Sequence, residues 1–282
     1  MLVARTLDEL AGDRAMLARN GRKLALVPTM GALHAGHLAL VEAARRRGAS
    51  VVASIFVNPL QFGPAEDLAG YPRDEAADLE ALREAGCELA WLPEVATMYP
   101  AASASVIEVS GPALRWEGAA RPGHFRGVAT VVAKLFGQVR PQLACFGEKD
   151  WQQLQVVRRM VRDFHFDVDI VAVPTVRAPD GLALSSRNRM LTPVERALAP
   201  SLHATLEALA AELADGLPAI TRTEAAAAAL GAAGVQPDYV ALVDAETLEQ
   251  LEAARPRGES PARLIAAARL GKVRLIDNLA MP

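Results

Sequence analysis

The alternation of short apolar runs with helix-like segments is the feature that most restricts how the first two-thirds of this chain can fold. Five runs rich in aliphatic and β-branched residues predict strands: "KLALVPT" (23–29), "SVVASIFVNP" (50–59), "CELAWLP" (87–93), "QLACFGEKD" (142–150) and "VDIVAVPT" (168–175). Helical patterns separate these runs. Because strands that alternate with helices build parallel sheets, we predict an α/β fold with a Rossmann-like, doubly wound parallel sheet over residues 1–176.

The pattern changes after about residue 176. There Thr192 stands as a helix N-cap, with Pro193 at the first helical position and Glu195 as the capping-box partner. The alanine-rich run "TRTEAAAAALGAAG" predicts a second helix, because alanine is the strongest helix former. "PDYVALVDAETL" predicts a strand, and the closing "RLIAAARLGKVRLIDNL" predicts two strands joined as a hairpin. We therefore predict a smaller C-terminal α+β lid domain over residues 177–282.

The stretch "VPTMGALHAGH" places two histidines three residues apart, directly after the first predicted strand. That strand would end at the carboxyl edge of the sheet, where open α/β folds bind ligands. Gly31 and Gly36 permit close approach of the backbone, and a helix beginning near His37 would direct its free N–H groups to the same place. We predict that His34 and His37 bind phosphate oxygens and stabilise the charge that develops during attack on an α-phosphate.

Two other interpretations of His34 and His37 compete with phosphate binding. Each could be a structural histidine, but two of the chain's five histidines in one H-x-G-H stretch after a buried strand disfavour that interpretation. A zinc site is the second alternative. No Cys, Asp or Glu stands close by in the sequence to complete a ligand set, which disfavours zinc.

Polar residues follow two other predicted strands. In "FVNPLQF", Asn58 and Gln61 are neutral groups able to hold a polar, mostly aliphatic substrate, although asparagine before proline is also a common turn former. In "FGEKDWQQ", Lys149 is placed to meet a triphosphate and Asp150 to accept from a ribose hydroxyl, with Gln153 one helical turn along. The alternative here is an aspartate that only caps the helix.

The segment "GLALSSRNRML" lies at the predicted domain boundary. Ser185, Ser186 and Arg187 form a small, polar, cationic loop suited to clamping phosphate, and the alternative is a solvated linker. A mobile loop at such a junction can close over a nucleotide and exclude water. His124 and Arg126 precede an apolar helix, where a cationic start hints at a bound anion, and the sequence leaves their role open.

Charge and composition exclude several classes of protein. With 30 Lys and Arg against 33 Asp and Glu, the formal net charge is −3, so no global basic field draws the chain to nucleic acid or anionic lipid. The N-terminus has no signal-peptide core, and no run of about 18 uncharged apolar residues predicts a membrane span. The two cysteines stand apart in apolar settings, as in a reducing compartment. We predict a cytoplasmic enzyme.

The quoted motifs together resemble those of the bacterial pantothenate synthetase (pantoate–β-alanine ligase) family, in the nucleotidyltransferase superfamily. The similar segments are "PTMGALHAGH", "SIFVNPLQF", "YPR", "FGEKDWQQL", "VPTVRAPDGLALSSRNRML" and "ARLGKVRLIDN", in order along nearly the whole chain. The resemblance implies a dimeric enzyme that uses ATP and Mg2+. It implies that pantoate and ATP form pantoyl adenylate and pyrophosphate, and that the amine of β-alanine then displaces AMP to give pantothenate.

The resemblance also implies a role for each matching residue. The catalytic residues would be His34, His37, Lys149, Ser185, Ser186 and Arg187. The ATP contacts would be Met30, Gly31, His37, Gly147, Lys149, Asp150, Val176, Leu184, Ser185, Ser186 and Arg187. The pantoate contacts would be Met30, Asn58, Gln61 and Gln153. The chain departs from the family at Leu184, where methionine is usual, and at Trp151, where tyrosine is expected. Neither change removes a group that the chemistry needs.

Three rival functions remain beside the ligase. A plain nucleotidyltransferase explains the H-x-G-H motif but not "NPLQF" or "FGEKD", and it would release pyrophosphate without pantoate. A nucleotide sensor should have lost part of the phosphate-binding set, and an aminoacyl-tRNA synthetase is disfavoured by the charge of −3. No metal ligand is assigned, since Mg2+ can be carried largely by ATP and water. Whether Glu66, Asp67, Asp74 or Asp78 touches it stays open.

Overall fold

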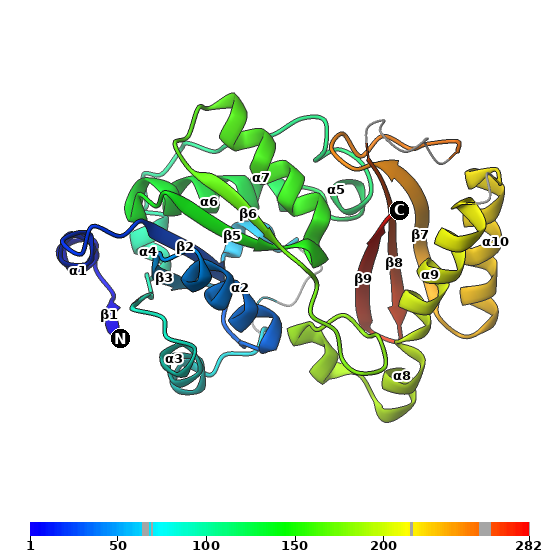
Figure 1. Cartoon of the computed structure of the whole chain (residues 1–282), viewed down its shortest axis with the longest axis horizontal. Coiled ribbons are helices and arrows are strands. Elements are labelled where there is room, and N and C mark those ends of the chain that lie inside the picture. Colours follow the sequence, from blue (N-terminus) through cyan, green and yellow to red (C-terminus); the bar gives the residue numbers. More distant parts are fainter. Residues whose placement is uncertain (64–67, 69, 215–216, 254–260, 282) are drawn as a thin grey trace. The chain divides into compact units, whose positions relative to one another are not determined.

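A computed structural model describes the chain except for residues 64–67, 69, 215–216, 254–260 and 282. It contains two compact units (Figure 1). The first comprises Met1–Glu148 and Gln153–Pro174, and the second comprises Lys149–Gln152 and Thr175–Pro282. These units differ from the predicted division at 176/177 mainly in the short segment Lys149–Gln152, which packs with the second unit.

The first unit contains a six-stranded parallel sheet with the strand order β1-β4-β3-β2-β5-β6. Its strands are β1 (Leu2–Ala4), β2 (Leu24–Thr29), β3 (Ser50–Ile55), β4 (Leu89–Trp91), β5 (Leu143–Gly147) and β6 (Asp169–Val173). The predicted α/β class with a doubly wound parallel sheet is confirmed. Five of the six strands match the five predicted runs, whereas the short N-terminal strand β1 carries no recognisable pattern.

The helices of this unit connect consecutive parallel strands. They are α1 (Leu7–Ala18), α2 (Ala35–Arg46), α3 (Glu75–Glu84), α4 (Val95–Met98), α5 (Glu117–Ala120), α6 (His124–Val139) and α7 (Trp151–Asp163), of which α7 begins in the segment assigned to the second unit. Helix α2 buries Leu40 and Val41 in one cluster with Val27 of β2 and Val51 of β3. This packing fixes the direction of α2 at the carboxyl end of β2.

The order of the strands creates a switch point between β2 and β5. From β2 the chain proceeds through β3 and β4 toward one edge of the sheet, and it then returns to place β5 and β6 on the other side. In open α/β sheets, ligands bind outside the carboxyl ends of the strands at such a point. The segments that follow β2 and β5 are therefore the first places to look for a site.

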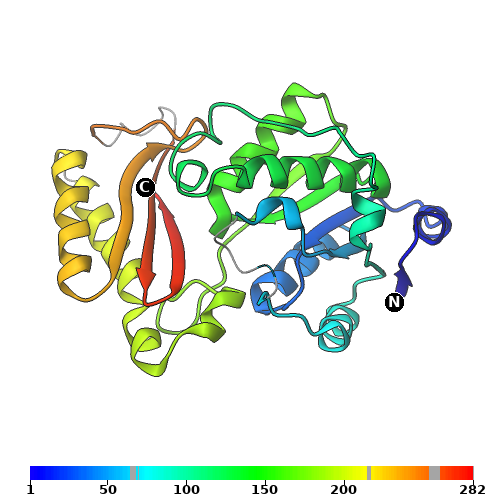
Figure 2. The same ribbon diagram turned by 180° about the vertical axis from the view of Figure 1, so that it is seen from behind.

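The second unit contains the predicted helices and strands, and the strands form one antiparallel sheet. Its strands β7 (Gln236–Asp244), β8 (Ala262–Leu270) and β9 (Val273–Ala280) are antiparallel neighbours in that order, so the predicted hairpin is confirmed. Its helices are α8 (Pro193–Leu198), α9 (Ser201–Ala214) and α10 (Ala219–Ala232). Helices α9 and α10 (yellow) pack along this sheet (orange and red) in Figure 2.

Local sequence accounts for these helices. The predicted capping box is present, with Thr192 accepting from the backbone of Glu195 and the Glu195 carboxylate accepting from that of Thr192. Pro200 separates α8 from α9. Leu206 and Leu230 of the two long helices share a buried cluster with Leu264 of β8, which holds the helices on the sheet.

Candidate active site

The turn after β2 differs from the prediction in one respect. Helix α2 begins at Ala35, not near His37, so His34 is its N-cap and His37 lies in its first turn. The Nδ1 atom of His34 accepts a hydrogen bond from the backbone N–H of Gly36 at 3.1 Å. The imidazole thus takes the place of the Ser, Thr, Asp or Asn side chain that usually caps a helix.

The two histidines form a reciprocal pair. Nδ1 of His37 accepts a hydrogen bond from the backbone N–H of His34 at 3.4 Å, and the ring centroids are 4.1 Å apart. A nitrogen that accepts from a backbone N–H carries no proton of its own, so each neutral ring carries its proton on Nε2. Both Nε2–H groups are therefore donors located at the positive end of a helix.

Asp78 of α3 fixes the turn that delivers these histidines. Its carboxylate accepts from the backbone N–H groups of Ala32 and Leu33 at 2.9 and 2.8 Å, and its side chain is buried. Gly31 and Ala32 both have positive φ angles, +81° and +49°. A Cβ on Gly31 would lie 2.8 Å from the Asp78 carboxylate, which explains the glycine. Sequence reasoning missed this contact, since the partners are 45 and 46 residues apart.

The segment after β3 holds a buried amide network. Asn58 caps the short 3₁₀ helix η1 (Pro59–Gln61), and its Nδ2 donates to Oε1 of Gln61 and to the carbonyl of Gly127, both at 3.1 Å. Its Oδ1 accepts from the hydroxyl of Tyr99 at 2.8 Å. Asn58 is 1% exposed, so these contacts occupy it within the protein. Tyr99 gave no signal in the sequence.

Gln61, which is also buried, links this network to Met30 and His124. Its Nε2 lies 2.9 Å from the sulfur of Met30, so the structure brings together two residues predicted to contact pantoate. His124 Nδ1 lies 2.9 Å from the carbonyl of Gln61 and must donate, because a carbonyl only accepts. Nε2 of His124 then accepts from Arg121 at 3.1 Å. The sequence left His124 without a role, and the structure makes it a support of Gln61, whereas Arg126 is exposed.

The remaining predicted residues of the first unit lie at or after the end of β5. Gly147 is its last residue, and Gln153 lies in the first turn of α7, partly buried. The space beside Gly147 is open, since a Cβ there would meet no atom within 4 Å. A ligand can therefore approach the backbone closely at the end of β5, beside the switch point.

Lys149 and Asp150 are in the second unit, where β9 and β8 hold their segment. Nζ of Lys149 lies 3.7 Å from Oδ1 of Asp150, and the Lys149 side chain is 17% exposed. The carbonyl of Lys149 accepts from Asn278 at 2.9 Å. Trp151, where tyrosine was expected, donates from Nε1 to the carbonyl of Ala245 at 2.8 Å, a bond through which the indole anchors this segment.

The 176–188 loop carries the other predicted phosphate ligands. Backbone hydrogen bonds close it on itself, since Leu184 N–H donates to the carbonyl of Val176 at 2.9 Å. Ser185 then caps a short 3₁₀ helix by accepting from the N–H of Arg187 at 3.3 Å, and Ser186 is buried within that helix. The loop therefore brings Val176, Leu184 and the Ser-Ser-Arg run into one ordered structure.

Four acidic residues were considered above as possible metal ligands, and the two that the structure describes both accept hydrogen bonds from the backbone. Asp74 caps α3 by accepting from Ala77 N–H at 3.1 Å, and both oxygens of Asp78 accept from backbone. Glu66 and Asp67 lie outside the described residues. Within the described ranges, no group of three or more His, Cys, Asp or Glu side chains could hold a metal ion. Across those same ranges, no helix is long and apolar enough to cross a membrane.

A doubly wound parallel sheet whose switch point meets the N-terminus of a histidine-capped helix is an arrangement in which α/β proteins bind phosphate-bearing ligands. The family model for pantoate-beta-alanine ligase matches residues 2–280. The chain belongs to the pantoate–β-alanine ligase family, and the sequence-based identification of that family is confirmed.

Full-length relatives and solved structures agree with this assignment. The chain is 58% identical over 282 residues to the pantothenate synthetase of Rhizorhabdus wittichii, covering 100% of this chain and 99% of the relative. The crystal structure of the Thermus thermophilus pantothenate synthetase has a TM-score of 0.92 and 52% identity, with coverage of 100% and 99%. The ligase of Francisella tularensis, solved with β-γ ATP and β-alanine, has a TM-score of 0.83 and 32% identity, with coverage of 100% and 98%.

Proposed function

We propose that the residues described above carry out the two half-reactions of a pantoate–β-alanine ligase. The enzyme activates pantoate with ATP as pantoyl adenylate, releasing pyrophosphate, and β-alanine then displaces AMP to give pantothenate. The observation that carries this proposal is the reciprocal pair formed by His34 and His37, with their proton-bearing Nε2 atoms at the N-terminus of α2. Such a site suits the negative charge of a nucleotide phosphate.

His34 and His37 bind the phosphates of ATP and stabilise the transition state of the first step. Charge accumulates on the oxygens of the α-phosphorus as the carboxylate of pantoate attacks. Two fixed N–H donors and a helix N-terminus can neutralise that charge without reorganising. Gly31 and Met30 approach the nucleotide from the turn before α2.

Pantoate is held by Gln61 and Gln153, with Met30 between ATP and pantoate. A carboxylate is a weak nucleophile, so the enzyme gains most by holding it in line with the α-phosphorus. Asn58 and His124 fix Gln61 through its side chain and its carbonyl. In this arrangement Asn58 contributes to pantoate binding by orienting Gln61.

Lys149 and Arg187 supply positive charge for the phosphates, while Ser185 and Ser186 complete the clamp. A lysine acts there as a point charge, whereas arginine can bind phosphate through two parallel hydrogen bonds. Asp150 and Gly147 contact the adenosine. Val176 and Leu184, the latter in place of the usual methionine, contact the adenine and the residues around it.

Mg2+ would be held mainly by the phosphates of ATP and by water, because this ion keeps several waters and uses few protein ligands. Asp150, whose side chain is 47% exposed, is the residue that would offer the ion a carboxylate besides its contact with the adenosine. When bound, the ion neutralises charge on the phosphates.

No covalent enzyme intermediate forms in either step. Burial raises the pKa of the Cys87 and Cys145 thiols to about 11, so neither is a thiolate at neutral pH. The amine of β-alanine attacks the acyl carbon of the adenylate directly, and AMP leaves. We also propose that the enzyme works in the cytoplasm, as two unpaired, buried cysteines suit a reducing compartment, and as the homodimer that the family resemblance implies.

The two half-reactions are tested separately. The protein is incubated with ATP, Mg2+ and pantoate in the absence of β-alanine, and we expect pyrophosphate and an enzyme-bound acyl adenylate. Adding β-alanine should then release AMP and pantothenate together. Absence of pyrophosphate, where ATP binding is independently demonstrated, contradicts the proposal. Pyrophosphate release that does not depend on pantoate favours a plain nucleotidyltransferase instead.

A further inference from the structure

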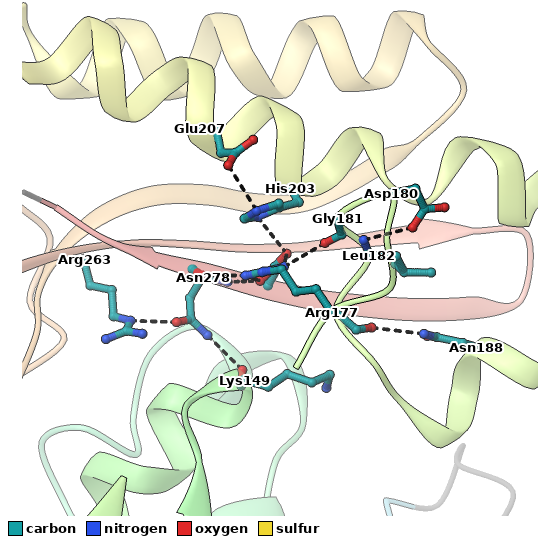
Figure 3. Close-up of polar contacts among 12 residues, drawn as sticks. Lys149, Arg177, Asp180, Gly181, Leu182, Asn188, His203, Glu207, Arg263 and Asn278 are labelled. Carbon is teal, nitrogen blue, oxygen red and sulfur yellow. Dashed lines mark hydrogen bonds and ion pairs between the residues drawn. The ribbon is translucent and has the colours of Figure 1, made fainter. Parts of the chain in front are cut away.

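The motif "RLIDN" near the end of the chain was part of the family resemblance but carried no role. The structure places its last two residues, Asp277 and Asn278, in β9, and both are buried at 4% exposure. Figure 3 shows the polar contacts around them. Because successive side chains of a strand point to opposite faces, neighbouring residues can hold two different segments of the unit.

Asn278 holds the segment that carries Lys149. Its Nδ2 donates to the carbonyl of Lys149 at 2.9 Å, and its Oδ1 accepts from Nε of Arg263 at 2.6 Å (Figure 3). The guanidinium of Arg263 lies over the ring of Trp151, 3.4 Å from its centroid. Asn278 therefore holds the backbone of Lys149 directly, and it holds the side chain of Trp151 indirectly through Arg263.

Asp277 holds the start of the 176–188 loop. Its two carboxylate oxygens accept from both terminal nitrogens of Arg177, at 2.6 and 2.8 Å. Arg177 also donates to the carbonyl of Gly181 at 3.1 Å and so closes the turn that leads to the Ser-Ser-Arg run (Figure 3). Nδ1 of His203 lies 3.4 Å from the same carboxylate. Asp277 is thus connected to the loop by a bidentate ion pair.

Stability alone explains this arrangement poorly. The cost of removing two charges from water largely cancels the attraction of a buried ion pair, so apolar side chains of the same volume would serve a core equally well. What a bidentate pair and a donor–acceptor amide add is fixed geometry. Here that geometry relates the backbone of Lys149 to the backbone of the loop that carries Arg187.

We propose that Asp277 and Asn278 are positioning residues that set the two cationic groups of this unit, Lys149 and Arg187, in register for the phosphates of ATP. We assign neither residue a contact with a substrate, and both act only through the segments they hold. This inference rests on the phosphate-binding roles proposed above for those two groups.

The first test is the Asn278→Asp variant, which keeps the shape of the side chain but turns an oxygen toward the carbonyl of Lys149. We expect kcat for pantoate-dependent pyrophosphate formation to fall by about 10- to 100-fold, the order expected for displacement of a catalytic group by 1 Å, while KM for pantoate changes by less than about twofold. Unchanged kcat contradicts the proposal.

A double-mutant cycle separates positioning from general damage. In a Lys149→Met background, measured in single turnover, Asn278→Asp should lower the rate by no more than about twofold. The reason is that Asn278 acts by positioning the Lys149 ammonium group, which this background lacks. Equal fold-losses in both backgrounds mean a structural role and overturn the proposal. If Lys149→Met by itself keeps the wild-type rate, the role of Lys149 is what fails, and the inference falls with it.

Asp277→Asn is tested in the same way against Arg187→Met, with the same two criteria. The matched control is Leu230→Ala, which removes a buried side chain from α10 in the same unit. It should lower the melting temperature at least as much as either β9 variant while leaving kcat at 25 °C unchanged. If the control loses kcat in proportion to stability, the losses of the β9 variants report stability and the proposal is rejected.

Discussion

Nδ1 of His34 lies 3.1 Å from the backbone nitrogen of Gly36, so the first histidine of the H-x-G-H motif caps the helix that carries the second. The contact also explains the glycine. A Cβ at position 36 would lie 2.8 Å from Cε1 and 2.9 Å from Nδ1 of His34, so any larger residue displaces the ring.

Gly36→Ala should therefore impair catalysis without unfolding the enzyme. Alanine favours a helix by about 1 kcal/mol over glycine, but the added methyl group pushes the imidazole of His34 off its cap. We expect kcat for adenylate formation to fall at least about tenfold, with a melting temperature close to that of the wild type. Steady-state kinetics and thermal unfolding measure both quantities.

The matched control is Gly137→Ala in α6, where a Cβ would meet no atom within 4 Å. There the helix propensity acts alone, and the free energy of unfolding should rise by about 0.5–1 kcal/mol with activity unchanged. Full activity in both variants would show that the ring of His34 is not needed in this place.

Asp78→Asn should weaken the turn between β2 and α2. An amide replaces one of two acceptors with a donor that faces a backbone N–H, so Ala32 or Leu33 loses its partner. We expect the free energy of unfolding to fall by about 1–3 kcal/mol, measured by denaturant titration, and kcat to fall with it. Asp74→Asn on the same helix is the control, because asparagine caps a helix as well as aspartate does. A similar loss in both variants would assign the effect to helix α3 rather than to the turn.

Tyr99→Phe should loosen Gln61 through Asn58. It removes the hydroxyl that donates to Oδ1 of Asn58, whose Nδ2 holds Gln61. Since Leu60 N–H still donates to that oxygen, the effect is moderate. We expect KM for pantoate to rise by about two- to tenfold, equivalent to about 0.4–1.4 kcal/mol, with KM for ATP unchanged. If KM rises for ATP and not for pantoate, Tyr99 does not act on pantoate binding through Asn58 and Gln61.

Acid should lower the free energy of unfolding partly by protonating Asp277. Burial by itself would raise the pKa of this carboxyl, but the nearby imidazole of His203 and the hydrogen bonds and charge of Arg177 lower it below the ordinary 3.8. The ionised carboxylate therefore contributes stability that is fully present above about pH 4 and is lost as the pH falls through the lower, folded-state pKa. As the pH falls below about 4, the unfolding free energy of Asp277→Asn should fall less steeply than that of the wild type. Parallel slopes in denaturant titrations would contradict this.

Local patterns made most elements predictable. The aliphatic run ending at Thr29 became β2, the capping box at Thr192 began α8, and the two apolar runs around Gly271 formed the β8–β9 hairpin. Helix α1 was missed, although Thr6 and Glu9 form a capping box that the sequence spells out. Its weak separation of polar and apolar faces hid it.

The supporting contacts of the site were beyond the sequence. Asp78 meets Leu33 across 45 residues and Tyr99 meets Asn58 across 41, and no periodicity reports which distant polar groups will meet. The functional groups themselves stood out because they follow strand ends or sit in a polar loop. From a single sequence, the residues that bind substrate are thus easier to predict than the residues that hold them in place.

The hydrogen bond between Asn278 and Lys149 also has a consequence for folding. It joins positions 129 residues apart, and its donor lies in the last strand of the chain. Contacts between residues so far apart in sequence form late, because the entropy cost of closing a long loop comes before the contact can stabilise the fold. During synthesis, Lys149 leaves the ribosome long before β9 does. Its segment reaches its final place only when the last strand joins the sheet, so a nascent chain truncated before β9 has the histidine pair but not the anchored lysine.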